Sequence, residues 1–117
     1  MKPEAEEQAT LMEWASYMKY KYPGLKMLFH IPNGGSRNPI EAAHLKKQGV
    51  KPGVPDLFLP VPTKKYHGLF IELKAKQGRV MENQKMWIRW LNANGYKAVI
   101  CWGCDHAIKT IEEYLNG

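Results

Sequence analysis

The chain has 117 residues, of which 44% are hydrophobic and 24% charged, and these values are typical of a single globular domain rather than a disordered segment. No apolar run approaches the ~20 residues of a membrane helix, and the N-terminus lacks the apolar core of a secretion signal. Two cysteines exclude a disulfide-rich scaffold. From these three features together we expect a soluble, cytoplasmic protein. The formal net charge of +6 favours a polyanion such as nucleic acid as the partner.

The first half of the chain predicts two helices separated by a short strand. Apolar residues at helical spacing indicate a helix over 3–20, which ends before Pro23-Gly24. A strand over 26–31 and a glycine-rich turn over 32–35 are expected next. An asparagine followed by proline then opens a helix over 38–48, and a glycine ends it.

The second half predicts a hairpin and then a strand between two helices. Strands are expected over 56–61 and 68–75, joined as an antiparallel hairpin by a longer loop. A helix over 82–94 and an apolar strand over 96–102 follow. Asp105 is expected to cap the last helix.

This order, α-β-α-β-β-α-β-α, predicts an α/β sandwich in which helices flank a small mixed sheet. Part of the sheet should be parallel, because the last strand joins its neighbours through a crossover helix. No repeat or domain boundary interrupts the pattern, so residues 1–117 are interpreted as one domain.

Two acids and a lysine on the hairpin form the strongest candidate site. Because side chains alternate along a strand, Glu72 and Lys74 lie on the same face, and a partner strand ~5 Å away can bring Asp56 close to Glu72. Two carboxylates about 4 Å apart repel each other by roughly 4 kcal/mol near a protein surface, and a divalent cation removes that repulsion. Oxygen ligands without a nearby Cys or His favour Mg²⁺ or Mn²⁺. An exposed acid–lysine salt bridge without chemistry is the alternative.

Several segments resemble a known family. Pro55-Asp56 followed by Glu72-Leu73-Lys74 resembles the Pro-Asp…(Asp/Glu)-X-Lys signature of the restriction-endonuclease-like superfamily. More specific matches, to the VRR-NUC family of virus-type replication-repair nucleases, are Phe29-His30-Ile31-Pro32-Asn33-Gly34-Gly35, Gly49-Val50-Lys51-Pro52-Gly53-Val54-Pro55-Asp56-Leu57, Phe70-Ile71-Glu72-Leu73-Lys74 and Asn83-Gln84. The resemblance covers essentially the whole chain and implies a restriction-endonuclease-like fold.

The resemblance also implies roles for individual residues. Asp56 and Glu72 correspond to metal-binding acids, Lys74 to the catalytic lysine, and the Leu73 carbonyl to a further metal ligand. A glutamate of the first helix completes such sites; Glu4 shares a helical face with Leu11 and is favoured, and Glu7 is the alternative. Gln84 resembles a helix glutamine that orients the site, although it is also an ordinary polar helix position. The implied cofactor is Mg²⁺ or Mn²⁺.

A DNA contact surface is expected around the glycine-rich turn. Backbone amides at Gly34 can approach a phosphate, and Arg37 and Lys51 add positive charge. His30 and Asn33 are included in this surface, although they can equally pack at the end of a strand and make a turn. Nothing in the sequence indicates a helix that reads bases.

Two other functions remain open. Cys101-Trp102-Gly103-Cys104, between a strand and a helix, is also the pattern of a thiol-redox site, and with His106 it offers part of a zinc site. A DNA-binding module without cleavage is the second alternative.

Single-domain members of the VRR-NUC family resemble dimeric Holliday-junction resolvases of replication, recombination and repair. The resemblance therefore implies a metal-dependent endodeoxyribonuclease that acts as a homodimer on four-way DNA junctions, since a two-fold dimer suits a two-fold substrate.

Overall fold

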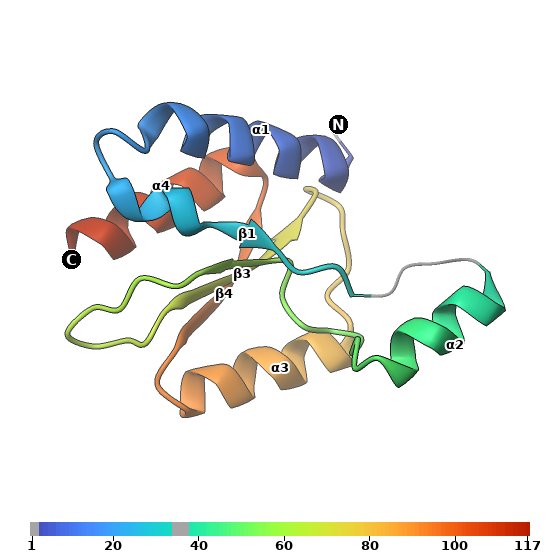
Figure 1. The fold of residues 1–117 in the computed structure, drawn as a ribbon. Helices are drawn as coiled ribbons and strands as arrows, with labels where there is room; N and C mark the ends of the chain where they lie inside the picture. The colour runs from blue at the N-terminus through green and yellow to red at the C-terminus, as the bar shows by residue number, and fades with distance from the viewer. Residues whose placement is uncertain (1–2, 34–37) are drawn as a thin grey trace.

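The structure is a computed structural model and describes residues 3–33 and 38–117. The elements in chain order are α1 (Glu4–Met18), the 3₁₀ helix η1 (Pro23–Met27), β1 (Phe29–His30), α2 (Pro39–Lys47), β2 (Leu57–Leu59), β3 (Leu69–Lys74), α3 (Glu82–Ala93), β4 (Lys97–Trp102) and α4 (Cys104–Asn116). Figure 1 shows α1 and α4 covering one face of a central sheet, α3 lying against the other, and α2 projecting from the body. This is the expected mixed α/β sandwich.

The four strands lie in the order β1-β2-β3-β4. β2 is antiparallel to both β1 and β3, so the expected hairpin is confirmed, and its register places Leu57 opposite Ile71. β4 is parallel to β3, as the crossover through α3 requires. Asp56 immediately precedes β2, and the hairpin register therefore brings it beside the carboxyl-terminal half of β3.

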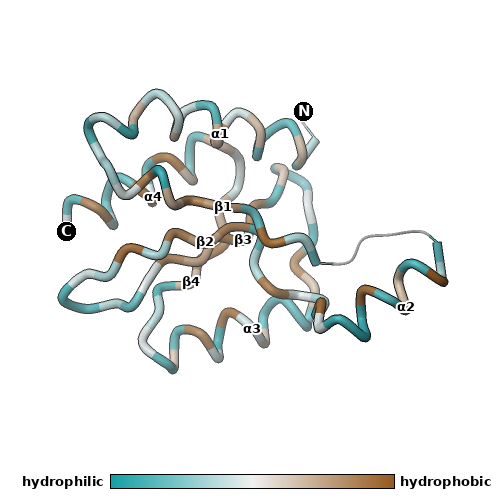
Figure 2. Tube along the Cα trace, viewed as in Figure 1, coloured by the Kyte–Doolittle hydropathy of each residue, from teal (hydrophilic) through white to brown (hydrophobic). Residues whose placement is uncertain are grey.

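The main core lies between the sheet and the α1/α4 layer. Leu69, Ile71 and Leu73 of β3 are almost fully buried, and they pack in one cluster with Leu11 of α1 and Ile111 of α4. The alternation expected for this strand is therefore confirmed on its apolar face. Hydrophobic residues concentrate in the central strands, whereas the β2–β3 loop is mostly hydrophilic (Figure 2).

The expected strand over 26–31 is wrong for most of its length. Residues Pro23–Met27 form η1, in which a proline occupies the first turn and Leu25 is buried, and only Phe29–His30 pair with β2. The apolar residues of this segment are buried by a 3₁₀ turn against the core rather than by strand alternation. A run this short does not distinguish the two.

The expected cap of the last helix is also wrong. α4 begins at Cys104, Gly103 is its N-cap residue with φ +90°, and Asp105 lies inside the first turn. The Cys104 N–H is bound instead by the Glu7 carboxylate of α1. By contrast, the cap expected at the start of α2 is confirmed, because Asn38 Oδ1 accepts from the N–H groups of Ile40 and Glu41.

Over residues 3–33 and 38–117, none of the helices has the length and apolar character needed to cross a membrane.

Candidate active site

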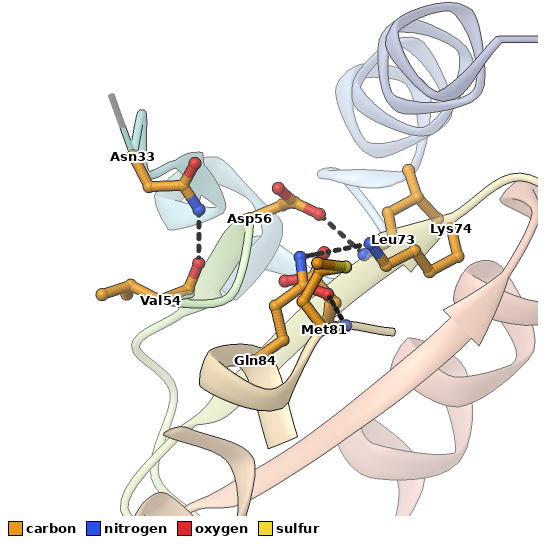
Figure 3. A network of polar contacts seen from close by, with 8 residues as sticks. Asn33, Val54, Asp56, Leu73, Lys74, Met81 and Gln84 are labelled. Atoms are coloured by element: carbon orange, nitrogen blue, oxygen red, sulfur yellow. Dashed lines mark hydrogen bonds and ion pairs between the residues drawn. The ribbon is translucent and has the colours of Figure 1, made fainter. Parts of the chain in front are cut away.

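Asp56 is held in place through both its main chain and its side chain. Its carbonyl oxygen accepts the N–H of Ile31 at 2.7 Å and the Nδ1–H of His30 at 2.9 Å. Its Oδ2 accepts the N–H of Leu73 at 2.8 Å, so the carboxylate reaches across to β3 (Figure 3). The start of β2 is thereby fixed to both neighbouring strands.

Glu72 and Lys74 extend from β3 beside this carboxylate. Both are unusual because they are charged side chains that are only 2% and 6% exposed. Lys74 Nζ lies 3.7 Å from Glu72 Oε2, and Gln84 Nε2 of α3 donates to the same oxygen at 3.2 Å. Asp56, Glu72 and Lys74, which strand alternation places in one group, thus lie together.

Gln84 joins this cluster from the first turn of α3. Its Oε1 accepts the N–H of Met81 at 2.8 Å, which caps the helix (Figure 3). Its Nε2 donates to Glu72 Oε2. The amide group is therefore fixed at both ends. This arrangement gives Gln84 the geometry of a residue that orients Glu72, rather than that of a free polar surface side chain.

The surroundings of Glu72 disfavour its ionised form. Burial, chiefly, raises the pKa of Glu72 from 4.5 to about 8; the Asp56 carboxylate raises it further, Lys74 lowers it, and Glu4 raises it. Among the described residues, Glu72 Oε1 is buried without a hydrogen-bond partner. A buried carboxylate oxygen of this kind needs a proton or a cation.

Glu4 and Glu7, the two alternatives for a third acid, have different surroundings. Glu7 binds the Cys104 N–H, whereas the carboxylate of Glu4 lies beside Gly78 and acts on Glu72 through its charge. Within the described parts of the chain, no three His, Cys, Asp or Glu side chains converge into a metal-binding group. The convergence found is therefore a pair, Asp56 and Glu72, and the third-ligand role of Glu4 stays a prediction.

Two residues expected to contact DNA bind the protein backbone. Asn33 Nδ2 donates to the Val54 carbonyl at 2.8 Å (Figure 3), and His30 donates to the Asp56 carbonyl. Both therefore hold the segment that leads into Asp56. Lys51 is exposed on the loop before that segment, while Gly34 and Arg37 lie outside the described residues.

Sequence reasoning missed the role of Gly53. Its φ of +88° is one that other residues rarely adopt, and a Cβ there would lie 2.7 Å from the Asn83 carbonyl carbon at the start of α3. The close approach packs the loop before Asp56 against the helix that carries Gln84. A glycine between two prolines in Pro52-Gly53-Val54-Pro55 was the available signal.

The Cys-X-X-Cys segment lacks the features of a reactive site. Burial raises the pKa of the Cys101 thiol, which donates to Thr110 Oγ1 at 3.5 Å, whereas a redox thiol needs a lowered pKa. His106 Nδ1 accepts the Trp102 N–H at 3.0 Å and is thus engaged by the turn itself. These contacts favour a structural role for the segment.

The fold and the buried acid–acid–lysine cluster together define an α/β domain with a candidate active site on its central hairpin. The VRR-NUC domain model matches residues 2–105, so the chain belongs to the VRR-NUC family and the resemblance seen in its motifs is confirmed. Among solved structures, it is similar to a VRR_NUC domain protein with 35% sequence identity and a TM-score of 0.86, over 99% of this chain and 90% of that one. No curated protein gives a significant match.

Proposed function

We propose that the protein is a metal-dependent endodeoxyribonuclease that hydrolyses DNA phosphodiester bonds. The observation that carries this proposal is the buried pair Asp56 and Glu72, with Lys74 Nζ 3.7 Å from Glu72 and one Glu72 oxygen unpaired among the described residues. Membership of a nuclease family supports the same conclusion.

The donor set fits Mg²⁺ or Mn²⁺, because it consists of hard carboxylate oxygens that repel each other without a cation. Asp56 and Glu72 would hold the ion. The Leu73 carbonyl would join them, since in a strand the N–H and C=O of one residue face the same neighbour and the Leu73 N–H already faces Asp56. Glu4 is the proposed fourth ligand. When bound, the ion would supply charge neutralisation at the phosphate and a lower pKa for an attacking water.

Lys74 and Gln84 supply the remaining chemistry. The ammonium of Lys74 can hold the attacking water or offset the negative charge that develops on the phosphate. It is kept in place by Glu72, which in turn is oriented by Gln84. A buried ammonium is worth more than an exposed one because water does not screen it.

DNA approach is proposed to involve the loop that carries Lys51, together with Gly34 and Arg37. His30 and Asn33 are proposed to support the metal site rather than to touch DNA, because they hold the backbone from Val54 to Asp56. An excess of positive charge over the whole chain favours contact with the DNA backbone.

We further propose that the substrate is a four-way junction and that two copies act together. α3 exposes Trp90 (57%) and Met86 (51%), which line an apolar hollow of about 200 Å³ with Trp87. An exposed apolar patch of this kind is a candidate contact between copies, and a two-fold dimer presents two active sites to a two-fold substrate.

The test is a cleavage panel of four-way junctions, flaps, splayed arms and linear duplex, run beside a solution mass measurement. We expect cleavage with Mg²⁺ or Mn²⁺, none in EDTA, a preference for junctions and the mass of a dimer. A pure, folded protein that binds DNA but cuts no substrate with either metal would make it a DNA-binding module. If the protein is a monomer and cuts all branched substrates equally, the proposed junction-resolving role is wrong, while the nuclease activity stands.

A further inference from the structure

One cavity is separate from the acidic cluster but adjoins it. It has a volume of about 440 Å³ and lies between α1, the end of β4 and the start of α4. Its walls include Glu7, Lys76, Trp102 and Asp105. This volume lies in the range of cavities that hold small organic groups.

The cavity is joined to the active site through the ends of two strands. Trp102, the last residue of β4, is the register partner of Lys74, and the Gly103 N–H donates to the Lys74 carbonyl at 2.8 Å. Figure 1 shows the first turn of α1 beside the end of β3, and α1 and β3 are in contact. Carboxyl ends of parallel strands are where α/β proteins bind ligands.

The turn between β4 and α4, which lines the cavity, is held by hydrogen bonds. The Glu7 carboxylate binds the Cys104 N–H, and the Trp102 N–H donates to His106 Nδ1 at 3.0 Å. The indole of Trp102 nevertheless stays 38% exposed, although the ring is large and apolar. A fixed backbone with a partly open aromatic ring is suited to stacking.

The charges of the cavity select between the parts of a nucleotide. Among the described residues that line the cavity, Glu7 and Asp105 are acids and Lys76 is the one cation, so the interior disfavours a phosphate. An uncharged base fits better, because its amino group can donate to a carboxylate while its face lies on the indole. Lys76, an exposed side chain, can then meet the adjoining phosphate at the entrance.

We propose that this cavity binds the base of an unpaired nucleotide, stacked on Trp102, next to the phosphate that enters the acidic site. The inference rests on the proposed function, because it takes DNA as the substrate. At a branch point a base is free to leave the duplex. Binding of that base in the cavity would let the protein recognise the branch point although nothing in its sequence indicates a helix that reads bases.

The experiment measures binding in EDTA, where no strand is cut, to a splayed-arm DNA whose first unpaired nucleotide is 2-aminopurine. A blunt duplex of the same length is the reference. The wild-type protein should quench the 2-aminopurine fluorescence and bind the splayed arm more tightly. Trp102→Leu should lose the quenching and bind the splayed arm roughly 10- to 100-fold more weakly, with duplex binding unchanged.

Trp102→Phe, which keeps an aromatic face, should restore most of the binding. Tyr20→Ala, which removes an exposed ring in the turn that follows α1, should behave as wild type. Absence of quenching with the wild-type protein would overturn the proposal whether or not the variants fold. Equal loss with Trp102→Leu on both DNAs would also overturn it. Normal quenching without cleavage in Mg²⁺ or Mn²⁺ would instead reject the nuclease activity alone.

Discussion

Lys74 is the side chain on which the chemistry of the site depends most directly. It is buried, and Glu72 holds its ammonium at 3.7 Å. Lys74→Ala should lower the cleavage rate by about 10²- to 10³-fold, because one preorganised charge at the phosphate is lost. DNA affinity should stay close to wild type, since an exposed lysine contributes more to phosphate contact than a buried one.

Lys85→Ala is the matched control, because Lys85 is an exposed lysine that forms an ion pair with Glu82 on its own helix. Single-turnover cleavage and equilibrium binding separate the two effects. Loss of affinity with an unchanged rate in Lys74→Ala would remove Lys74 from catalysis.

Glu72 makes the stability of the metal-free protein depend on pH. Its pKa is about 8 in the folded protein against 4.5 ordinarily, so the folded state binds this proton more tightly than the unfolded state. The resulting stabilisation is complete below about pH 4.5 and is lost as pH rises through 8. Glu72→Gln cannot titrate and should therefore melt at a higher temperature than wild type at pH 8.5 in EDTA.

Thermal melts at pH 6 and pH 8.5 test this prediction. The advantage of Glu72→Gln should grow between the two pH values, and Mg²⁺ should stabilise the wild type more than the variant at the higher one. Melting curves that shift in parallel for both proteins would show that Glu72 is not held protonated.

At the scale of single residues, the sequence was sufficient for the centre of the site and insufficient for its surroundings. Strand alternation places Glu72 and Lys74 on one face, and the hairpin brings Asp56 to them, so this group follows from local rules. The partners of His30, Asn33 and Glu7 do not follow. Each of these side chains binds a backbone group distant in sequence, and no spacing pattern encodes such a contact.

The element that precedes Asp56 is held by side chains that sequence analysis assigned to DNA. Asn33→Ala removes the 2.8 Å bond to the Val54 carbonyl and should loosen the start of β2. We expect weaker Mn²⁺ binding and slower cleavage, with DNA affinity unchanged. The reverse result, weaker DNA binding with metal binding unchanged, would return Asn33 to the DNA contact surface.

The junction between α1 and α4 depends on Glu7. Its carboxylate satisfies one of the free N–H groups at the start of α4 and complements the helix dipole there. Glu7→Ala should cost about 1 kcal/mol of the free energy of unfolding, as loss of a helix cap does. Glu6→Ala, on the exposed side of the same turn, should cost less.

Chemical unfolding of both variants measures the difference. Glu4→Ala completes the comparison, because it should reduce cleavage without this loss of stability. Equal stabilities for Glu7→Ala and Glu6→Ala would show that the cap contributes nothing.

Elements whose ends are marked by capping residues or glycines were predicted well. The segment without such marks was not. The helices with polar caps or glycine stops, such as α2 and α3, lie close to their expected bounds. The segment before β1 was misassigned, because its burial comes from packing of Leu25 into the core within a 3₁₀ turn. Tertiary contacts therefore determine that this segment is a 3₁₀ helix and not a strand.

For the whole molecule, the order of elements was enough to predict the layers. A hairpin followed by a crossover helix permits few arrangements, and the observed sheet has the antiparallel and parallel pairs expected of it. The cavity at Trp102 was not foreseeable, because it forms where α1, β4 and α4 meet.

The central claim is that Asp56 and Glu72 share one divalent cation, and calorimetric titration with Mn²⁺ tests it most directly. The wild-type protein should bind one ion and release a proton near pH 7.5, because Glu72 must ionise to become a ligand. Asp56→Asn and Glu72→Gln should each bind at least about tenfold more weakly, and Glu13→Gln, at an exposed glutamate of α1, should match the wild type. If both site variants bind Mn²⁺ as the wild type does, or if the wild type binds none, the two carboxylates do not form a metal site.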